Sequence, residues 1–133
     1  MKVAELMRTE VTTIAPDASI ADLVQTLADA RVSGLPVVDQ SGGIIGVVST
    51  TDVLKAAAEQ SDSESRASMF EQMKVSDIMT TTPHMIELDA DAREAAQRML
   101  YVEVRRLFVE DQGRLVGVIS QTDIAYAVGL GRL

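Results

Sequence analysis

The sequence contains no cysteine and no tryptophan, and it has a single histidine. The lack of cysteine excludes disulfides, thiolate metal sites and catalysis by a thiol nucleophile. The histidine, His84, has no pair of carboxylates at ligand spacing, so we expect neither a metal site nor a general base there. No motif pairs a nucleophile with a base, and the chain is therefore not expected to be an enzyme.

Basic residues are also scarce. The 12 lysines and arginines stand against 20 aspartates and glutamates, which gives a net charge of -8. A nucleic-acid partner is not expected, because neutralising phosphates requires a basic surface. No apolar stretch approaches the roughly 18 residues of a membrane-spanning helix, and the N-terminus lacks the apolar core of a signal peptide. We expect a cytoplasmic protein with no membrane partner.

Aromatic residues make up only 3% of the chain, while hydrophobic residues of all kinds make up 47%. The core must then be built from aliphatic side chains and methionine. A chain of 133 residues suits one compact domain, or two small units that share a core.

The sequence does contain an internal repeat. Residues 3–54 align with residues 75–125 at an offset of about 72, and about a third of the paired positions are identical. The string GVVSTTD at 46–52 returns as GVISQTD at 117–123. A period this long does not fit a solenoid, so the pattern predicts two pseudo-symmetric halves.

Each half has the same predicted order of strand, helix, strand, strand and helix. In the first half these elements are expected at 11–14, from Ile20 onward, at 35–39, at 44–49 and at 50–58. Ser19 and Asp22 have capping-box spacing before the first helix, and Asp91 and Glu94 repeat it in the second half. One half is too small to cover its own sheet. The predicted fold class is α/β (α+β), with two β-α-β-β-α repeats packed through their sheets.

The predicted organisation has four parts, namely a first repeat at 1–58, a linker at 59–74, a second repeat at 75–128 and a C-terminal tail at 129–133. The polar middle of the linker, QSDSES at 60–65, is expected to be a mobile connection. A helix is expected at 66–73, with Met69 and Met73 as packing residues on one face.

The sequence resembles a tandem pair of cystathionine-β-synthase (CBS) domains, also called a Bateman module. The resemblance rests on VAELM and VSDIM, then on SGLPVVDQSGGIIGVVSTTDV and VRRLFVEDQGRLVGVISQTDI, and it covers nearly the whole chain. It implies a regulatory module that binds an adenosine-containing ligand in the cleft between the repeats, and that forms a homodimer. The chain carries no effector domain, so the regulated partner is expected to be another, unknown polypeptide.

The repeated Ser-x-x-Asp string has two interpretations. Ser49 with Asp52, and Ser120 with Asp123, have the spacing of a capping box that only stabilises a helix start. A helix start also offers free N–H groups to phosphate, and a carboxylate there can accept both hydroxyls of a ribose. The resemblance implies this second role, with the aspartates holding ribose and the serines lying near phosphate. The two roles are compatible.

The resemblance further implies two composite sites, each drawing on both repeats. One is expected to contain Met7, Thr12, Ile14, Val32, Ser33, Arg105, Arg106, Ser120 and Asp123. The other is expected to contain Met79, His84, Ile86, Val104, Ser33, Gly34, Ser49 and Asp52. Arg105 and Arg106 would meet phosphate oxygens, unless they are simply solvated. Phe108 stands where the first repeat has Pro36, and it could fill or reshape the nearby base pocket.

The expected ligand is an adenine nucleotide, AMP or ATP, with or without Mg²⁺, while ADP, NAD and S-adenosylmethionine stay open. No resident cofactor is expected. The alternative function is an interaction scaffold that dimerises without any ligand.

Overall fold

The computed structural model describes all residues from Met1 to Leu133, and they form two compact units. Unit 1 consists of Met1–Val11 and His84–Leu133, and unit 2 consists of Thr12–Pro83. The opening segment of the first repeat thus packs in the unit built on the second repeat. The opening of the second repeat, residues 75–83, packs in the unit built on the first.

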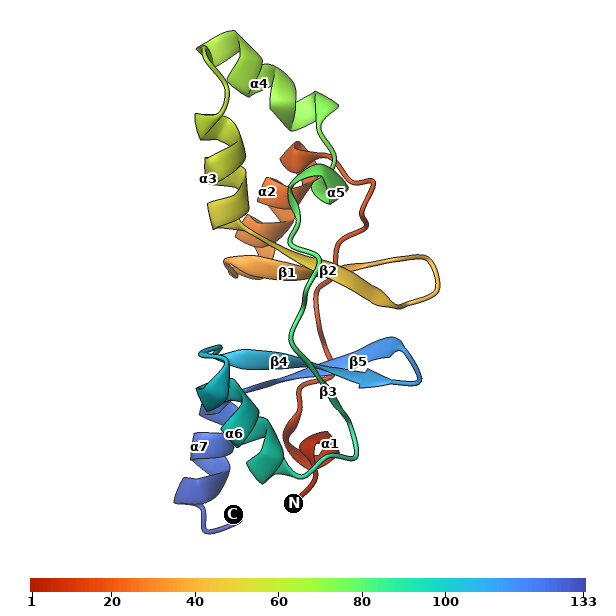
Figure 1. The fold of residues 1–133 in the computed structure, drawn as a ribbon, viewed down its shortest axis with the longest axis vertical. Helices are drawn as coiled ribbons and strands as arrows, with labels where there is room; N and C mark the ends of the chain where they lie inside the picture. Colours follow the sequence, from red (N-terminus) through yellow and green to blue (C-terminus); the bar gives the residue numbers. More distant parts are fainter. The chain divides into compact units, whose positions relative to one another are not determined.

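Unit 2 contains a two-stranded antiparallel sheet and four helices (Figure 1). Its elements are α2 (Ile20–Ala30), β1 (Gly34–Val38), β2 (Ile44–Ser49), α3 (Thr50–Ala58), α4 (Ser63–Gln72) and α5 (Val75–Ile78). In the turn between the strands, the Asp39 carboxylate accepts hydrogen bonds from the N–H groups of Ser41 and Gly43, at 2.9 and 3.0 Å. Helices α2 and α3 cover one face of the β1–β2 sheet (Figure 1).

Unit 1 contains a three-stranded sheet in the order β3-β4-β5. Its elements are α1 (Val3–Leu6), β3 (Met85–Glu87), α6 (Ala92–Tyr101), β4 (Arg106–Asp111), β5 (Arg114–Ser120) and α7 (Gln121–Gly129). Strand β3 runs parallel to β4, and β4 runs antiparallel to β5. The mixed α/β fold class predicted from the sequence is confirmed.

Each unit has its own aliphatic core with no buried charged or polar residue. Ile20, Leu23 and Val37 are fully buried in unit 2, and the matching core of unit 1 includes Met99 and Leu107. The exchanged segments contribute directly to these cores. Val3 in unit 1 and Val75 in unit 2, which correspond in the repeat, are both fully buried.

The strand expected at 11–14 is the main difference from the sequence prediction. Only Ile14 pairs there, as an isolated parallel bridge to Val37. In unit 1 the same position forms β3, and the N–H of Phe108 donates to the carbonyl of His84 at 3.0 Å. Pro36 takes the place of Phe108 in unit 2, and proline has no N–H to donate. The parallel ladder is therefore cut to one bridge.

Helix α4 begins earlier than predicted. It starts at Ser63, because the Asp62 carboxylate caps it by accepting a hydrogen bond from the N–H of Ser65 at 2.7 Å. This places the second half of the expected mobile connection inside a helix. Met69 is 3% exposed and Met73 packs against the same core, so the predicted packing role of these methionines is confirmed. No helix of the structure has the length and apolar character that crossing a bilayer requires.

The predicted boxes before α2 and α6 form only in part. Ser19 Oγ accepts the N–H of Asp22 at 3.0 Å, and Asp91 accepts the N–H of Arg93 at 2.8 Å. The Glu94 side chain pairs instead with Arg98, one turn along α6, at 3.3 Å.

Candidate functional site

The repeated serine–aspartate pairs lie where a strand passes directly into a helix. Ser49 ends β2 and precedes α3, and Ser120 ends β5 and precedes α7. Each serine Oγ accepts the N–H of its aspartate, at 3.3 Å for Asp52 and 3.1 Å for Asp123. Oδ2 of each aspartate in turn accepts a hydrogen bond from the serine N–H, at 2.8 Å for Asp52 and 2.9 Å for Asp123. The capping-box interpretation is confirmed at both positions.

The box uses the two carboxylate oxygens unequally. In each pair the serine hydroxyl also donates to the same Oδ2, at 3.1 Å for Asp52 and 2.9 Å for Asp123. Two hydrogen bonds thus fix Oδ2, while Oδ1 takes no part in the cap. Because a carboxylate oxygen can accept more than one hydrogen bond, each aspartate keeps acceptor capacity for an outside partner.

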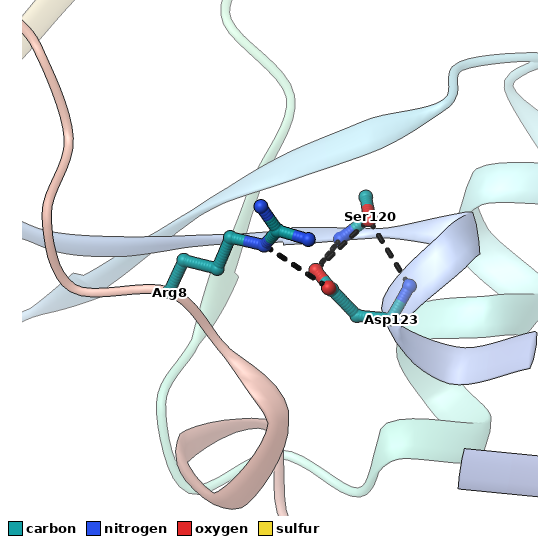
Figure 2. Close-up of polar contacts among 3 residues, drawn as sticks. All are labelled: Arg8, Ser120 and Asp123. Atoms are coloured by element: carbon teal, nitrogen blue, oxygen red, sulfur yellow. Dashed lines mark hydrogen bonds and ion pairs between the residues drawn. The ribbon is translucent and has the colours of Figure 1, made fainter. Parts of the chain in front are cut away.

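At Asp123 this outside partner is Arg8, which the sequence prediction missed. Arg8 Nε donates to Asp123 Oδ1 at 3.2 Å, and Figure 2 shows the guanidinium facing the carboxylate across from Ser120. The Asp123 side chain is 12% exposed and that of Arg8 is 71% exposed. Thr80 aligns with Arg8 at the repeat offset, and within unit 2 no donor reaches Oδ1 of Asp52. The two aspartates therefore have different partners.

A glycine allows the segment that carries Arg8 to approach β5. The backbones of Arg8 and Val118 exchange two hydrogen bonds, at 2.8 and 2.9 Å. A Cβ on the neighbouring Gly117 would lie 2.7 Å from the Arg8 carbonyl oxygen and 2.8 Å from Met7 Sδ. Gly46 is in the same situation, with the Thr80 carbonyl oxygen at 2.7 Å from its hypothetical Cβ. This close approach explains the glycine of the repeated string.

The turn before β4 also lies at the start of α7. The carbonyl of Arg105 accepts the N–H of Gln121 at 2.9 Å, and the Gln121 side chain donates to the carbonyl of Val104 at 3.1 Å. Arg106 is the first residue of β4 and pairs with Ser120 in the sheet register. Within unit 1, the structure therefore brings the arginine pair beside the Ser120–Asp123 cap. Both arginines are exposed.

The corresponding turn of unit 2 has the same backbone geometry. The carbonyl of Ser33 accepts the N–H of Thr50 at 2.9 Å, and Gly34 pairs with Ser49 in the sheet register. No basic side chain stands at these two positions. The starts of α3 and α7 thus have the same backbone geometry, but only the turn beside α7 carries basic side chains.

The two composite groupings each draw on both units. Unit 1 contains Met7, His84, Ile86, Val104, Arg105, Arg106, Ser120 and Asp123, and unit 2 contains Thr12, Ile14, Val32, Ser33, Gly34, Ser49, Asp52 and Met79. Their assembly across the units stays a prediction. Ile14 and Ile86 are 7% and 2% exposed and belong to the two cores. His84 is exposed, and no cluster of three or more metal-ligating side chains is present.

A cavity of about 380 Å³ lies next to the ion pair in unit 1. It is lined by Glu5, Leu6, Arg8, Thr122, Asp123 and Tyr126. Arg8 is the one cationic residue among them, against two carboxylates. Any anionic group that enters this cavity therefore depends on Arg8 for a counter-charge.

Comparisons with known proteins agree with the repeat. The CBS domain family model matches residues 3–59 and 75–130. An inosine-5'-monophosphate dehydrogenase of Methanocaldococcus jannaschii is 31% identical over 124 residues, which are 92% of this chain and 23% of that protein. The CBS domain-containing protein YhcV of Bacillus subtilis is 29% identical over 124 residues, 92% of this chain and 82% of that protein.

Among solved structures, the crystal structure of CBSX2 in complex with AMP superposes with a TM-score of 0.79. It is 28% identical, and the match covers 97% of each chain. The chain spans less than two thirds of the first curated relatives that it matches, 23% of the dehydrogenase and 57% of CBSX2 of Arabidopsis thaliana.

Proposed function

The chain belongs to the CBS domain family, and we propose that it is a regulatory CBS-domain pair that binds an adenosine-containing ligand and acts on a partner protein. The ligand is an adenine nucleotide such as AMP or ATP. The observation that carries the proposal is the polar arrangement at the start of α7, where a fixed carboxylate lies beside an arginine pair. The similarity to a CBS-domain protein that was crystallised with AMP supports the same class of ligand.

Asp123 is the proposed ribose-binding residue. Two hydrogen bonds from Ser120 hold its Oδ2 in place, so the carboxylate loses little conformational freedom when a ligand arrives. A ribose offers two neighbouring hydroxyl donors, and hydrogen bonds to an ionised carboxylate are stronger than those between neutral groups. Asp52 has the same cap in unit 2 and is proposed for the same role.

Arg105 and Arg106 are the proposed phosphate-binding residues. The backbone places them at the start of α7, where the helix dipole also favours an anion. The guanidinium group suits phosphate because it offers several donors in one plane. Ser120 Oγ already donates its proton to Asp123, so it contacts phosphate only if the hydroxyl turns away from the carboxylate.

The second candidate is a scaffold that dimerises without ligand, and exposed apolar side chains favour it. Leu100, Tyr101 and Tyr126 of unit 1 are 71%, 89% and 70% exposed. In unit 2, Val24 and Leu54 line an apolar cavity of about 540 Å³. Apolar patches of this kind usually mark interaction surfaces. A homodimer is compatible with both candidates, and ligand binding therefore separates them.

Isothermal titration calorimetry with adenosine, AMP, ADP and ATP, each with and without Mg²⁺, tests the proposal. We expect binding by the wild type and, in an Asp52→Ala background that leaves the Asp123 site to be measured, a loss of about 10- to 100-fold on adding Asp123→Ala, since paired acceptors for the ribose are removed. Asp62→Ala is the matched control, because it removes a helix cap at α4 and leaves the proposed site intact. Absence of binding at millimolar ligand would favour the scaffold, and unchanged affinity in Asp123→Ala would remove the ribose role.

A further inference from the structure

Arg8 contacts the proposed ribose carboxylate, although it is not among the residues assigned to ribose or phosphate. We propose that Arg8 makes the Asp123 site selective for adenosine ligands that carry phosphate. A ligand whose ribose binds Asp123 displaces the Arg8 guanidinium from Oδ1. Only a ligand that also carries an anionic group then offers the displaced guanidinium a new partner. This inference rests on the proposed function and adds a specificity-determining residue to it.

The first step is the occupancy of the carboxylate. Ser120 fills Oδ2 with two hydrogen bonds, and Arg8 Nε approaches Oδ1 to 3.2 Å (Figure 2). A ribose that binds through both hydroxyls needs Oδ1. Oδ1 accepts about two hydrogen bonds and Arg8 already uses one of these positions, so the second ribose hydroxyl and the arginine compete for it.

The second step is the size of this competition. The ion pair uses a single donor of Arg8, and the arginine side chain is 71% exposed, so water can solvate it after release. Asp123 is only 12% exposed, so its charge is less well screened than that of a surface pair. Because water solvates the arginine side of the pair, displacing it should lower the affinity of a neutral nucleoside by only roughly 2- to 5-fold.

The third step is what happens to the displaced side chain. The backbone of Arg8 is held by two hydrogen bonds to Val118, so the guanidinium stays near the site. Its two Nη groups form no hydrogen bond within unit 1 and remain free to bind an anion. The adjoining cavity is also lined by Glu5 and Asp123, so a phosphate that enters it meets no cation of its lining other than Arg8. A phosphorylated ligand thus replaces the ion pair that Arg8 loses when the ribose binds Asp123.

The repeat supplies an internal comparison. Thr80 aligns with Arg8, and its backbone exchanges the same pair of hydrogen bonds with Val47, at 2.9 and 2.8 Å. A threonine side chain carries no charge, so Asp52 has no competing cation at this position. The Asp52 site should therefore discriminate less between adenosine and AMP than the Asp123 site.

The test measures the ratio of the dissociation constants for adenosine and AMP by calorimetry. An Asp52→Ala background restricts binding to the Asp123 site. Arg8→Ala should bind adenosine about 3-fold more tightly and AMP about 3-fold more weakly, so the ratio should fall about 10-fold. Arg8→Lys should retain part of the selectivity, since it keeps the charge without the planar fork. Thr80→Arg, in an Asp123→Ala background, should raise the ratio at the Asp52 site.

The outcomes separate this inference from the function it rests on. If the wild type binds neither ligand, both fail. If both ligands bind but Arg8→Ala leaves the ratio of their dissociation constants unchanged, Arg8 does not set selectivity. The same holds if the variant weakens both ligands equally. In either case the proposed adenosine site is not contradicted. Thermal unfolding followed by circular dichroism should show each variant folded, because Arg8 and Thr80 are exposed.

Discussion

Replacing Gly117 with alanine should detach the opening segment from unit 1. The new Cβ would lie 2.7 Å from the Arg8 carbonyl oxygen and 2.8 Å from Met7 Sδ. The methionine side chain can move, but the carbonyl belongs to the backbone and accepts a hydrogen bond from Val118 at 2.9 Å. Relief therefore requires the segment to shift away from β5. Its two hydrogen bonds to Val118 would then weaken or break.

The magnitude follows from these two effects. Overpacking a tight contact costs about 1–3 kcal/mol, and each lost backbone hydrogen bond costs about 0.5–1.5 kcal/mol. The effects overlap, because a shifted segment relieves the clash by giving up the hydrogen bonds. We expect Gly117→Ala to lower the free energy of unfolding by about 2–4 kcal/mol. This is a large part of the roughly 5–15 kcal/mol typical of a small protein.

Urea denaturation followed by far-ultraviolet circular dichroism measures this loss. Gly129→Ala is the control, because it lies at the end of α7 and its Cβ would meet no atom within 4 Å. That change should be neutral, or stabilising by up to about 1 kcal/mol, since alanine favours a helix more than glycine does. Gly46→Ala should resemble Gly117→Ala. If the free energies of unfolding of Gly117→Ala and Gly129→Ala differ by less than about 0.5 kcal/mol, the close approach of the Arg8 segment to Gly117 does not matter for stability.

Three further predictions concern charge and assembly. Replacing Arg105 and Arg106 together with alanine should reduce AMP and ATP affinity strongly and adenosine affinity little, whereas equal losses in calorimetry would mean that the arginines only support the shape of the site. Light scattering should give twice the chain mass of 14.3 kDa, and a monomer mass at high protein concentration would exclude the homodimer. The pKa of Glu87 is raised, chiefly by a side-chain hydrogen bond with Glu110, its neighbour on β4. The folded state therefore binds the Glu87 proton more tightly than the unfolded chain, and stability falls as pH rises through the raised pKa. Glu87→Gln should remove that fall, and urea midpoints with the same pH slope in both proteins would contradict the pairing.

Local sequence patterns predicted the elements that local interactions determine. The helix expected at 50–58 has those bounds in the structure, because Ser49 and Asp52 form the complete box at its start. The strands around Leu35 and at 44–49 follow from apolar runs separated by a glycine turn. In both cases the signal and its partner lie within a few residues of each other. The predictions that failed have a different origin.

The missing strand at 11–14 depends on a residue more than twenty positions away. Its neighbour in the sheet is Pro36, whose lack of an N–H removes a ladder hydrogen bond that Phe108 makes in unit 1. From the sequence, the exchange of Pro36 for Phe108 is expected to affect a base pocket. Because proline has no N–H, the same exchange also removes a donor that the parallel ladder at 11–14 needs.

The contact between Arg8 and Asp123 joins residues that are 115 positions apart, and no periodicity predicts it. The sequence did contain a usable signal in Gly46 and Gly117. A glycine within a buried strand often marks the close approach of another backbone. What the sequence did not supply was the identity of the approaching segment, which depends on how the repeats exchange their openings.

The exchange of opening segments between the repeats determines which residue lies near which aspartate. In two self-contained repeats, position 8 would belong to the same unit as Asp52, its partner in the first repeat. The structure instead places Arg8 with Asp123, and Thr80 with the unit that contains Asp52. A substitution in the opening of one repeat therefore changes the surroundings of the aspartate in the other repeat. Gly46 and Gly117 allow the opening segments of both repeats the same close approach to a strand. The charge difference between Arg8 and Thr80 can therefore arise without any change in the backbone. Two copies of one fold can thus differ in ligand preference through a single side chain.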